Sequence, residues 1–130
     1  MAQARILLIE DGSTYAKLAT ILLTASGYAV TWASTAEDGL QVAQRETPDL
    51  ILMDINLPRM DGFSAVRMLR QDPRTMHIST LALTADRIRS EQEREKAREA
   101  GFDAYLEKPI DEATFRAVVG QYLGSLGGAP

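Results

Sequence analysis

Residues 50–54 read Leu-Ile-Leu-Met-Asp, four consecutive apolar residues followed by an acid. A continuous apolar run without polar alternation is typical of a strand that is covered on both faces. Residues 6–9 (Ile-Leu-Leu-Ile) repeat this pattern and are also followed by acids, Glu10 and Asp11. The two segments predict central strands of a parallel sheet, each with carboxylates at its carboxyl end.

Three further strands are predicted at residues 81–83, 29–33 and 104–106. The last two alternate more between apolar and polar residues, which suits the edges of a sheet. A helix pattern follows each strand, so the chain alternates strand and helix five times. This order predicts a five-stranded, doubly wound parallel sheet, (βα)5, with helices on both faces.

The helices are placed by their start and stop signals. The first follows Ser13 and stops at Gly27, and Ser34 with Glu37 forms a capping box for the second, which ends before Pro48. The third ends ahead of residue 73, the fourth is the highly charged segment 87–100, and residue 111 caps the fifth. The core face of the first helix is expected to carry Tyr15, Leu18, Ala19, Leu22 and Leu23.

The composition of the chain excludes several classes of function. The chain has 130 residues, 45% of them hydrophobic, with 14 basic and 18 acidic side chains and no cysteine. We expect one domain over residues 1–123 and a flexible tail or linker stub over 124–130. The formal net charge of −4 disfavours direct nucleic-acid binding, and the absence of a membrane span or leader predicts a cytoplasmic protein without membrane contact.

Ligands of such a sheet bind beyond the carboxyl ends of its strands, where the strand order reverses. The predicted strands deliver three carboxylates, a hydroxyl and a lysine to that edge: Glu10, Asp11, Asp54, Thr84 and Lys108. Converging carboxylates repel one another unless a hard cation such as Mg²⁺ binds them. A carboxylate can also attack phosphorus, with a lysine and a hydroxyl holding the phosphoryl oxygens. The edge therefore predicts a site for Mg²⁺ and a phosphoryl group.

Four motifs, in order and spaced over nearly the whole chain, carry a family resemblance. They are Glu10-Asp11, residues 54–62 (Asp-Ile-Asn-Leu-Pro-Arg-Met-Asp-Gly), residues 83–85 (Leu-Thr-Ala) and residues 100–109 (Ala-Gly-Phe-Asp-Ala-Tyr-Leu-Glu-Lys-Pro). With them the chain resembles the receiver domain of two-component response regulators, in the stand-alone form of the chemotaxis regulators. The resemblance implies the flavodoxin-like strand order 2-1-3-4-5.

The resemblance also implies roles at the phosphorylation site. Asp54 would accept a phosphoryl group from a phosphohistidine on a histidine kinase or a histidine phosphotransfer protein. Mg²⁺ would be bound directly by Asp11 and Asp54, by the backbone carbonyl of Asn56, and by Glu10 through water. Lys108 would pair with the phosphorylated Asp54.

Further implied roles concern switching and lifetime. Thr84 would move its hydroxyl onto the phosphoryl group, and Tyr105 would follow by turning inward. The peptide bond before Pro109 would be cis. The small polar residues Asn56 and Asp86 would admit an attacking water, which predicts a short-lived phosphoryl group.

The resemblance thus predicts a signalling switch rather than an enzyme, with only self-phosphotransfer and autodephosphorylation activity. Its output would be binding of a downstream protein through the fourth helix, fifth strand and fifth helix. The fourth helix, short of large apolar side chains, fits either a switch surface or a merely solvated helix. The chain would be a monomer or a weak phosphorylation-dependent dimer.

Three alternatives stay open at this point. An aspartate-nucleophile phosphohydrolase of the haloacid dehalogenase type would need a second aspartate where this chain has Asn56, and a cap domain. A flavodoxin-like cofactor binder is disfavoured because Glu10 and Asp11 would repel the phosphate of FMN. A phosphorylation-independent docking module would carry the same residues without using them.

Overall fold

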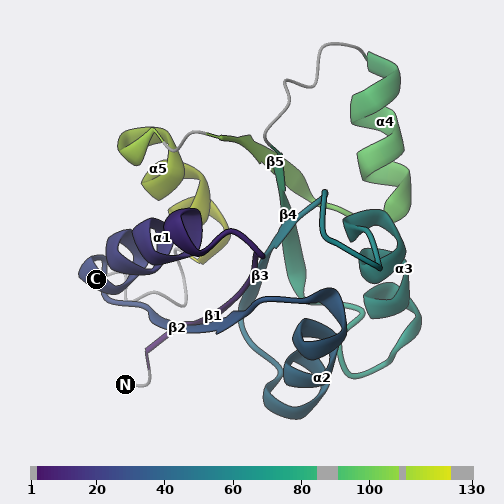
Figure 1. The fold of residues 1–130 in the computed structure, drawn as a ribbon, viewed down its shortest axis with the longest axis horizontal. Helices are drawn as coiled ribbons and strands as arrows, with labels where there is room; N and C mark the ends of the chain where they lie inside the picture. Colours follow the sequence, from purple (N-terminus) through teal and green to yellow (C-terminus); the bar gives the residue numbers. More distant parts are fainter. Residues whose placement is uncertain (1–2, 85–90, 109–110, 124–130) are drawn as a thin grey trace.

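Five parallel strands and five helices alternate along the chain in the computed structural model, which describes residues 3–84, 91–108 and 111–123 (Figure 1). The sheet has the order β2-β1-β3-β4-β5, as predicted, with the weaker strands β2 and β5 at its edges. The elements are β1 (Arg5–Ile9), α1 (Ser13–Ala25), β2 (Ala29–Ala33), α2 (Ala36–Glu46), β3 (Leu50–Asp54), α3 (Gly62–Gln71), β4 (Ser79–Thr84), α4 (Glu91–Ala100), β5 (Ala104–Glu107) and α5 (Glu112–Leu123).

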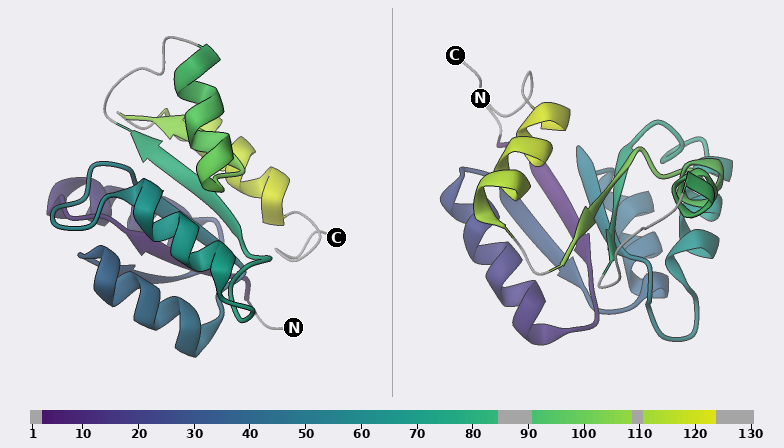
Figure 2. Two further views of the ribbon diagram at one scale, coloured as in Figure 1. Left: turned by 90° about the vertical axis from the view of Figure 1, so that its right-hand side faces the viewer. Right: turned by 90° about the horizontal axis from the view of Figure 1, so that it is seen from above.

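The sheet lies between two layers of helices (Figure 2). Helices α1 and α5 cover one face, and α2, α3 and α4 cover the other. Alternate side chains of each strand therefore enter different cores: Ile6 and Leu8 of β1 lie in the core under α1 and α5, and Leu7 and Ile9 in the other. This explains why the central strands are apolar without interruption.

Strand register places the first acid after β1 level with the acid that ends β3. Ile9 is paired with Met53, so the next residues, Glu10 and Asp54, lie side by side. Asp54 is in turn paired with Leu83, one residue before Thr84. The polar residues after the central strands thus meet at the carboxyl edge of the sheet.

The apolar face predicted for α1 is wrong at one position. Its buried residues are Ala16, Ala19 and Leu23, whereas Leu18 is 47% exposed. Leu18 lies two residues, or about 200° of helix rotation, from Ala16, so the two cannot both face the sheet. Ala16 packs against the sheet, and Leu18 points to solvent.

The predicted cap of α2 is one residue too early. The N-cap is Thr35, whose Oγ1 accepts the backbone N–H of Asp38 at 3.1 Å, so Ser34 and Glu37 do not form the expected box. Asp111 does cap α5, because its Oδ1 accepts the N–H of Ala113 at 3.3 Å. The described part of the charged fourth helix is Glu91–Ala100, and residues 87–90 lie outside the described residues, as does the predicted tail.

None of the helices within the described ranges has the length and apolar character that a membrane crossing requires.

Candidate functional site

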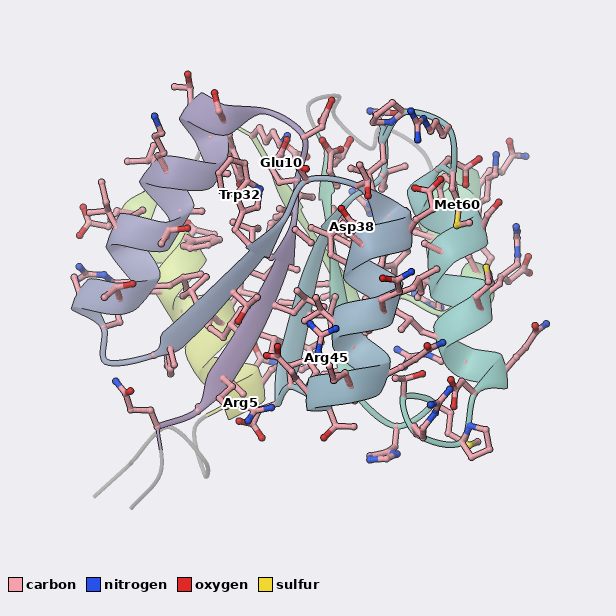
Figure 3. The ribbon with its side chains drawn as sticks, turned by 60° about the horizontal axis from the view of Figure 1, so that its bottom comes forward. Arg5, Glu10, Trp32, Asp38, Arg45 and Met60 are labelled. Carbon is pink, nitrogen blue, oxygen red and sulfur yellow. The ribbon has the colours of Figure 1, made fainter. Side chains whose placement is uncertain are left out.

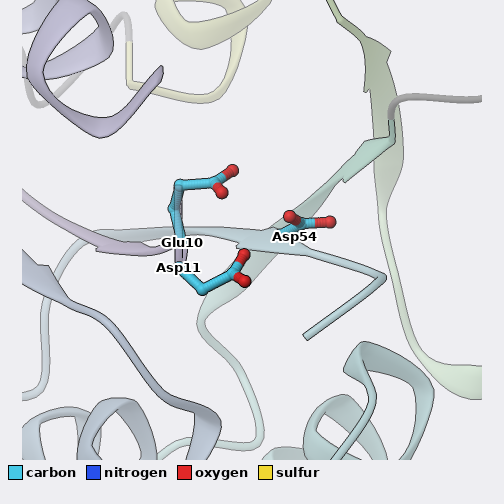
Figure 4. Close-up of side chains that lie close together, drawn as sticks. All are labelled: Glu10, Asp11 and Asp54. Atoms are coloured by element: carbon cyan, nitrogen blue, oxygen red, sulfur yellow. The ribbon is translucent and has the colours of Figure 1, made fainter. Parts of the chain in front are cut away.

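Three carboxylates converge at the carboxyl edge (Figure 4). Glu10 and Asp11 follow β1, Asp54 ends β3, and one oxygen of each lies within 4.8 Å of the others. Glu10 is 1% exposed and Asp54 5% exposed, whereas Asp11 is open to solvent. The structure therefore brings together the acids that the sequence placed at this edge, two of them buried.

Lys108 bridges the two buried carboxylates. It follows β5, and its backbone N–H donates to the carbonyl of Thr84 at 2.8 Å. Its Nζ lies 2.6 Å from Oε1 of Glu10 and 3.1 Å from Oδ2 of Asp54. Proximity to Asp54 was expected from the resemblance, but the shorter contact with Glu10 was not.

Burial and pairing perturb the ionisation of this group of residues. Burial raises the pKa of Glu10, and the hydrogen bonds from Lys108 and Gly12 only partly offset this. Burial lowers the pKa of Lys108, but hydrogen bonds to Glu10 and Asp54 outweigh it, so the pKa stays above its usual value. Lys108 is therefore a cation throughout the physiological range.

Backbone donors orient both buried carboxylates. The N–H of Gly12 donates to Oε2 of Glu10 at 2.8 Å, and the N–H of Asn56 donates to Oδ1 of Asp54 at 2.8 Å. Each carboxylate thus has one oxygen held by the backbone and the other by Lys108. The side chain of Asn56 itself is exposed.

Thr84 and Tyr105 belong to the face of the sheet that α4 covers. Thr84 is buried at the end of β4, two residues after Ala82, which lies in that core. Ala82 is paired with Tyr105, which is half-buried and packs against the same core. The two implied switch residues therefore lie on one face, toward α4. Glu10 and Asp54 come two residues after Leu8 and Leu52, on the face that α1 and α5 cover.

A hollow of about 240 Å³ separates α4 from β5. Tyr105 lines it together with Arg94, Ala97, Arg98, Phe102, Asp103 and Ala104. Pro109 and Asp86, named from the resemblance, lie outside the described residues.

Sequence reasoning missed Trp32, at the penultimate position of β2. None of the residues predicted at the carboxyl edge comes from this strand. Instead the indole N–H of Trp32 donates to the backbone carbonyl of Glu10 at 2.7 Å, and the two residues lie at the same edge of the sheet (Figure 3). The available signal was position alone: an aromatic residue near the end of a strand beside β1 can reach the residue after β1.

Trp32, the sole tryptophan of the chain, is expected to report cation binding. Its ring is hydrogen-bonded to the backbone of Glu10 and partly exposed, so a change at the carboxylates alters the surroundings of the indole. Titration with MgCl₂ should change the emission of the folded protein along a saturable curve. Asp11→Asn should shift that curve to higher Mg²⁺, and equal ionic strength of NaCl should leave emission unchanged. An identical curve for Asp11→Asn would contradict the assignment.

Comparison with known proteins identifies the class to which this fold and site belong. The family model of the response regulator receiver domain matches residues 6–120. The chain belongs to the response regulator receiver domain family. Receiver domains are signalling switches of two-component systems, so the phosphohydrolase and flavodoxin-type alternatives are not supported.

Relatives and solved structures agree with this class. The polar-differentiation response regulator DivK of Brucella ovis is 35% identical over 119 residues, which cover 92% of this chain and 95% of that protein. DivK of Brucella abortus matches to the same extent.

Two crystal structures are similar over almost their whole length. The receiver domain of a sensor histidine kinase from Pseudomonas aeruginosa, solved with a magnesium ion coordinated in its active-site cleft, is 32% identical, with a TM-score of 0.85 over 95% of this chain and 99% of that one. The chemotaxis protein CheY4 of Vibrio cholerae is 26% identical, with a TM-score of 0.87 over 94% of this chain and 100% of that one.

Proposed function

We propose that Asp54 accepts a phosphoryl group from a phosphohistidine of a histidine kinase or a histidine phosphotransfer protein. The observation that carries this proposal is the convergence of a buried Asp54 with two further carboxylates within 4.8 Å and an ammonium group at 3.1 Å. In the transfer, a carboxylate oxygen of Asp54 attacks phosphorus and the P–N bond breaks. The electron pair leaves with the imidazole nitrogen.

The site fits Mg²⁺ by its charge and donor atoms. Three carboxylates face one ammonium group, so a divalent cation would bring the group close to neutrality. Asp11 and Asp54 would hold it directly, the carbonyl of Asn56 would contribute, and Glu10 would act through water. When bound, Mg²⁺ would neutralise charge that the phosphoryl oxygens bring to the site.

Phosphorylation would change the conformation of residues on the face of the sheet that α4 covers. A phosphoryl group on Asp54 would draw the hydroxyl of Thr84 toward it, which frees space for Tyr105 to turn inward. Because Tyr105 lines the hollow between α4 and β5, its movement would change the shape of that surface. The surface of α4, β5 and α5 would then bind a downstream protein, and a weak dimer could use the same surface.

The finer expectations follow from the same site. Asn56 is exposed beside Asp54 and would admit the water that removes the phosphoryl group, together with Asp86. We expect a short-lived phosphoryl group, and a phosphorylated form that persists for many hours in Mg²⁺ buffer would contradict this. The domain is expected to be cytoplasmic and to span residues 1–123.

Acetyl phosphate tests the proposal directly. Wild-type protein incubated with acetyl phosphate and Mg²⁺ should gain the mass of one phosphoryl group, whereas Asp54→Asn should gain none. Asp61→Asn is the matched control: Asp61 lies on the same loop but caps α3 through its contact with Ser64, a role that asparagine also fills. Phosphoryl uptake by Asp54→Asn equal to wild type would refute the acceptor assignment, and absence of uptake by wild type would favour a phosphorylation-independent docking module.

A further inference from the structure

Lys108 has a third neighbour besides its two carboxylates. Its Nζ lies 4.4 Å from the centre of the Tyr15 ring. Tyr15 is in the first turn of α1, and Lys108 follows β5, so the contact joins two elements that both border the carboxyl edge. The side chain of Lys108 is only 17% exposed.

The ring and the carboxylates together confine the ammonium group. Glu10 and Asp54 bind it through charge and hydrogen bonds, and the ring attracts it through its quadrupole. This attraction is stronger at a desolvated site than in water. A lysine side chain has a flexible four-carbon stem, so an uncontacted ammonium would occupy many positions.

The hydroxyl of Tyr15 does not explain its position. Its oxygen is buried, and among the residues that the structure describes it has no hydrogen-bond partner. Burial and the charges of Glu10 and Asp54 raise the pKa of this phenol, so it stays protonated. A buried hydroxyl without a hydrogen-bond partner is unfavourable for stability. The contribution of Tyr15 at this position therefore comes from its ring.

We propose that Tyr15 is the positioning residue for Lys108: the Tyr15 ring holds the ammonium group beside Asp54 when Lys108 exchanges its carboxylate partners for the incoming phosphoryl group. The inference rests on the proposed function. Mg²⁺ held directly by Asp11 and Asp54, and by Glu10 through water, would compete with Lys108 for the two carboxylates that hold the lysine in this structure. The ring attracts the ammonium group over its whole face, so it keeps the group at the site while its partners change.

Nuclear magnetic resonance tests the contact without any phosphorylation. The chain has three lysines, so their ε-methylene signals are readily resolved. Those of Lys108 should be shifted upfield by the ring in wild type and Tyr15→Phe, and should move toward the position of the exposed Lys17 in Tyr15→Leu. Lys96, whose Nζ lies 5.0 Å from the Phe63 ring, is the internal control and should not change. Lys108 signals that are the same in wild type and Tyr15→Leu would overturn the contact.

Phosphorylation rates test the role. With acetyl phosphate and saturating Mg²⁺, Tyr15→Leu should reduce the rate of uptake by about fivefold, the size of a partly desolvated cation–π interaction. Tyr15→Phe, which keeps the ring, should take up the phosphoryl group at the wild-type rate. In a Lys108→Ala background Tyr15→Leu should have no further effect, because there is no ammonium group left to position. Tyr15→Met gives a second ring-free variant if Tyr15→Leu does not fold.

Phosphorylation of Asp54 and positioning of Lys108 by Tyr15 are contradicted by different results. A wild-type chain that takes up no phosphoryl group overturns the proposed function and the role of Tyr15 with it. Normal wild-type uptake together with an unchanged rate in Tyr15→Leu, or with an effect that persists without Lys108, overturns the role of Tyr15 alone.

Discussion

Lys108→Ala should lower the free energy of unfolding by about 3 kcal/mol in buffer without divalent cations, because it leaves two buried carboxylates without their cation. For a domain of this size, the melting temperature should fall by roughly 10 °C. Thermal unfolding followed by circular dichroism measures the effect. Lys17→Ala, which removes an exposed lysine on α1, is the matched control and should change stability by less than about 0.5 kcal/mol.

Magnesium should reverse most of this loss. Lys108 and the metal neutralise the same carboxylates, so MgCl₂ should raise the melting temperature of Lys108→Ala more than that of wild type. Adding Glu10→Gln to Lys108→Ala should also recover stability, since it removes one of the unpaired charges. An equal response of wild type and Lys108→Ala to Mg²⁺ would show that the lysine and the metal do not share the site.

Gly62→Ala is expected to destabilise the domain and to displace Asp54. A Cβ at Gly62 would lie 2.8 Å from Cα of Ile55 and 2.9 Å from the carbonyl oxygen of Asp54. Both contacts are with backbone, which cannot rotate away as a flexible side chain can. We expect a loss of about 3 kcal/mol, as for overpacking of a buried position, measured by urea unfolding.

The same variant should lose phosphoryl uptake beyond what its stability explains. A shift of about 1 Å in a reacting group can reduce a rate on the order of 100-fold. Gly120→Ala in α5 is the control, because a Cβ there meets nothing within 4 Å in the described part of the chain. It should stabilise the helix by about 0.5–1 kcal/mol and leave uptake unchanged. If folded Gly62→Ala takes up the phosphoryl group at the wild-type rate, the backbone at Asp54 and Ile55 tolerates the extra carbon.

Two predictions from the sequence were wrong, the core face of α1 and the N-cap of α2. In both cases neighbouring residues fit the local pattern about equally well. Leu18 was assigned to the core because leucine is apolar, but the α1 face that packs on the sheet is set by small residues such as Ala16. Ser34 and Thr35 are adjacent candidate caps, and only the path of the chain out of β2 selects Thr35. Local composition does not distinguish such neighbours.

The fold and the identity of the acids at the carboxyl edge follow from the sequence alone. Uninterrupted apolar runs at residues 6–9 and 50–53 require strands covered on both faces, and the acids that follow must then lie at the same edge of a parallel sheet. The groups that contact those acids, in contrast, are known only from the three-dimensional arrangement of the elements. The pairing of Lys108 with Glu10, and the placement of Trp32 and Tyr15 around them, depend on strand register and on how α1 packs. Such contacts join residues far apart in the chain and depend on sub-ångström to few-ångström geometry, which no periodicity in the sequence encodes.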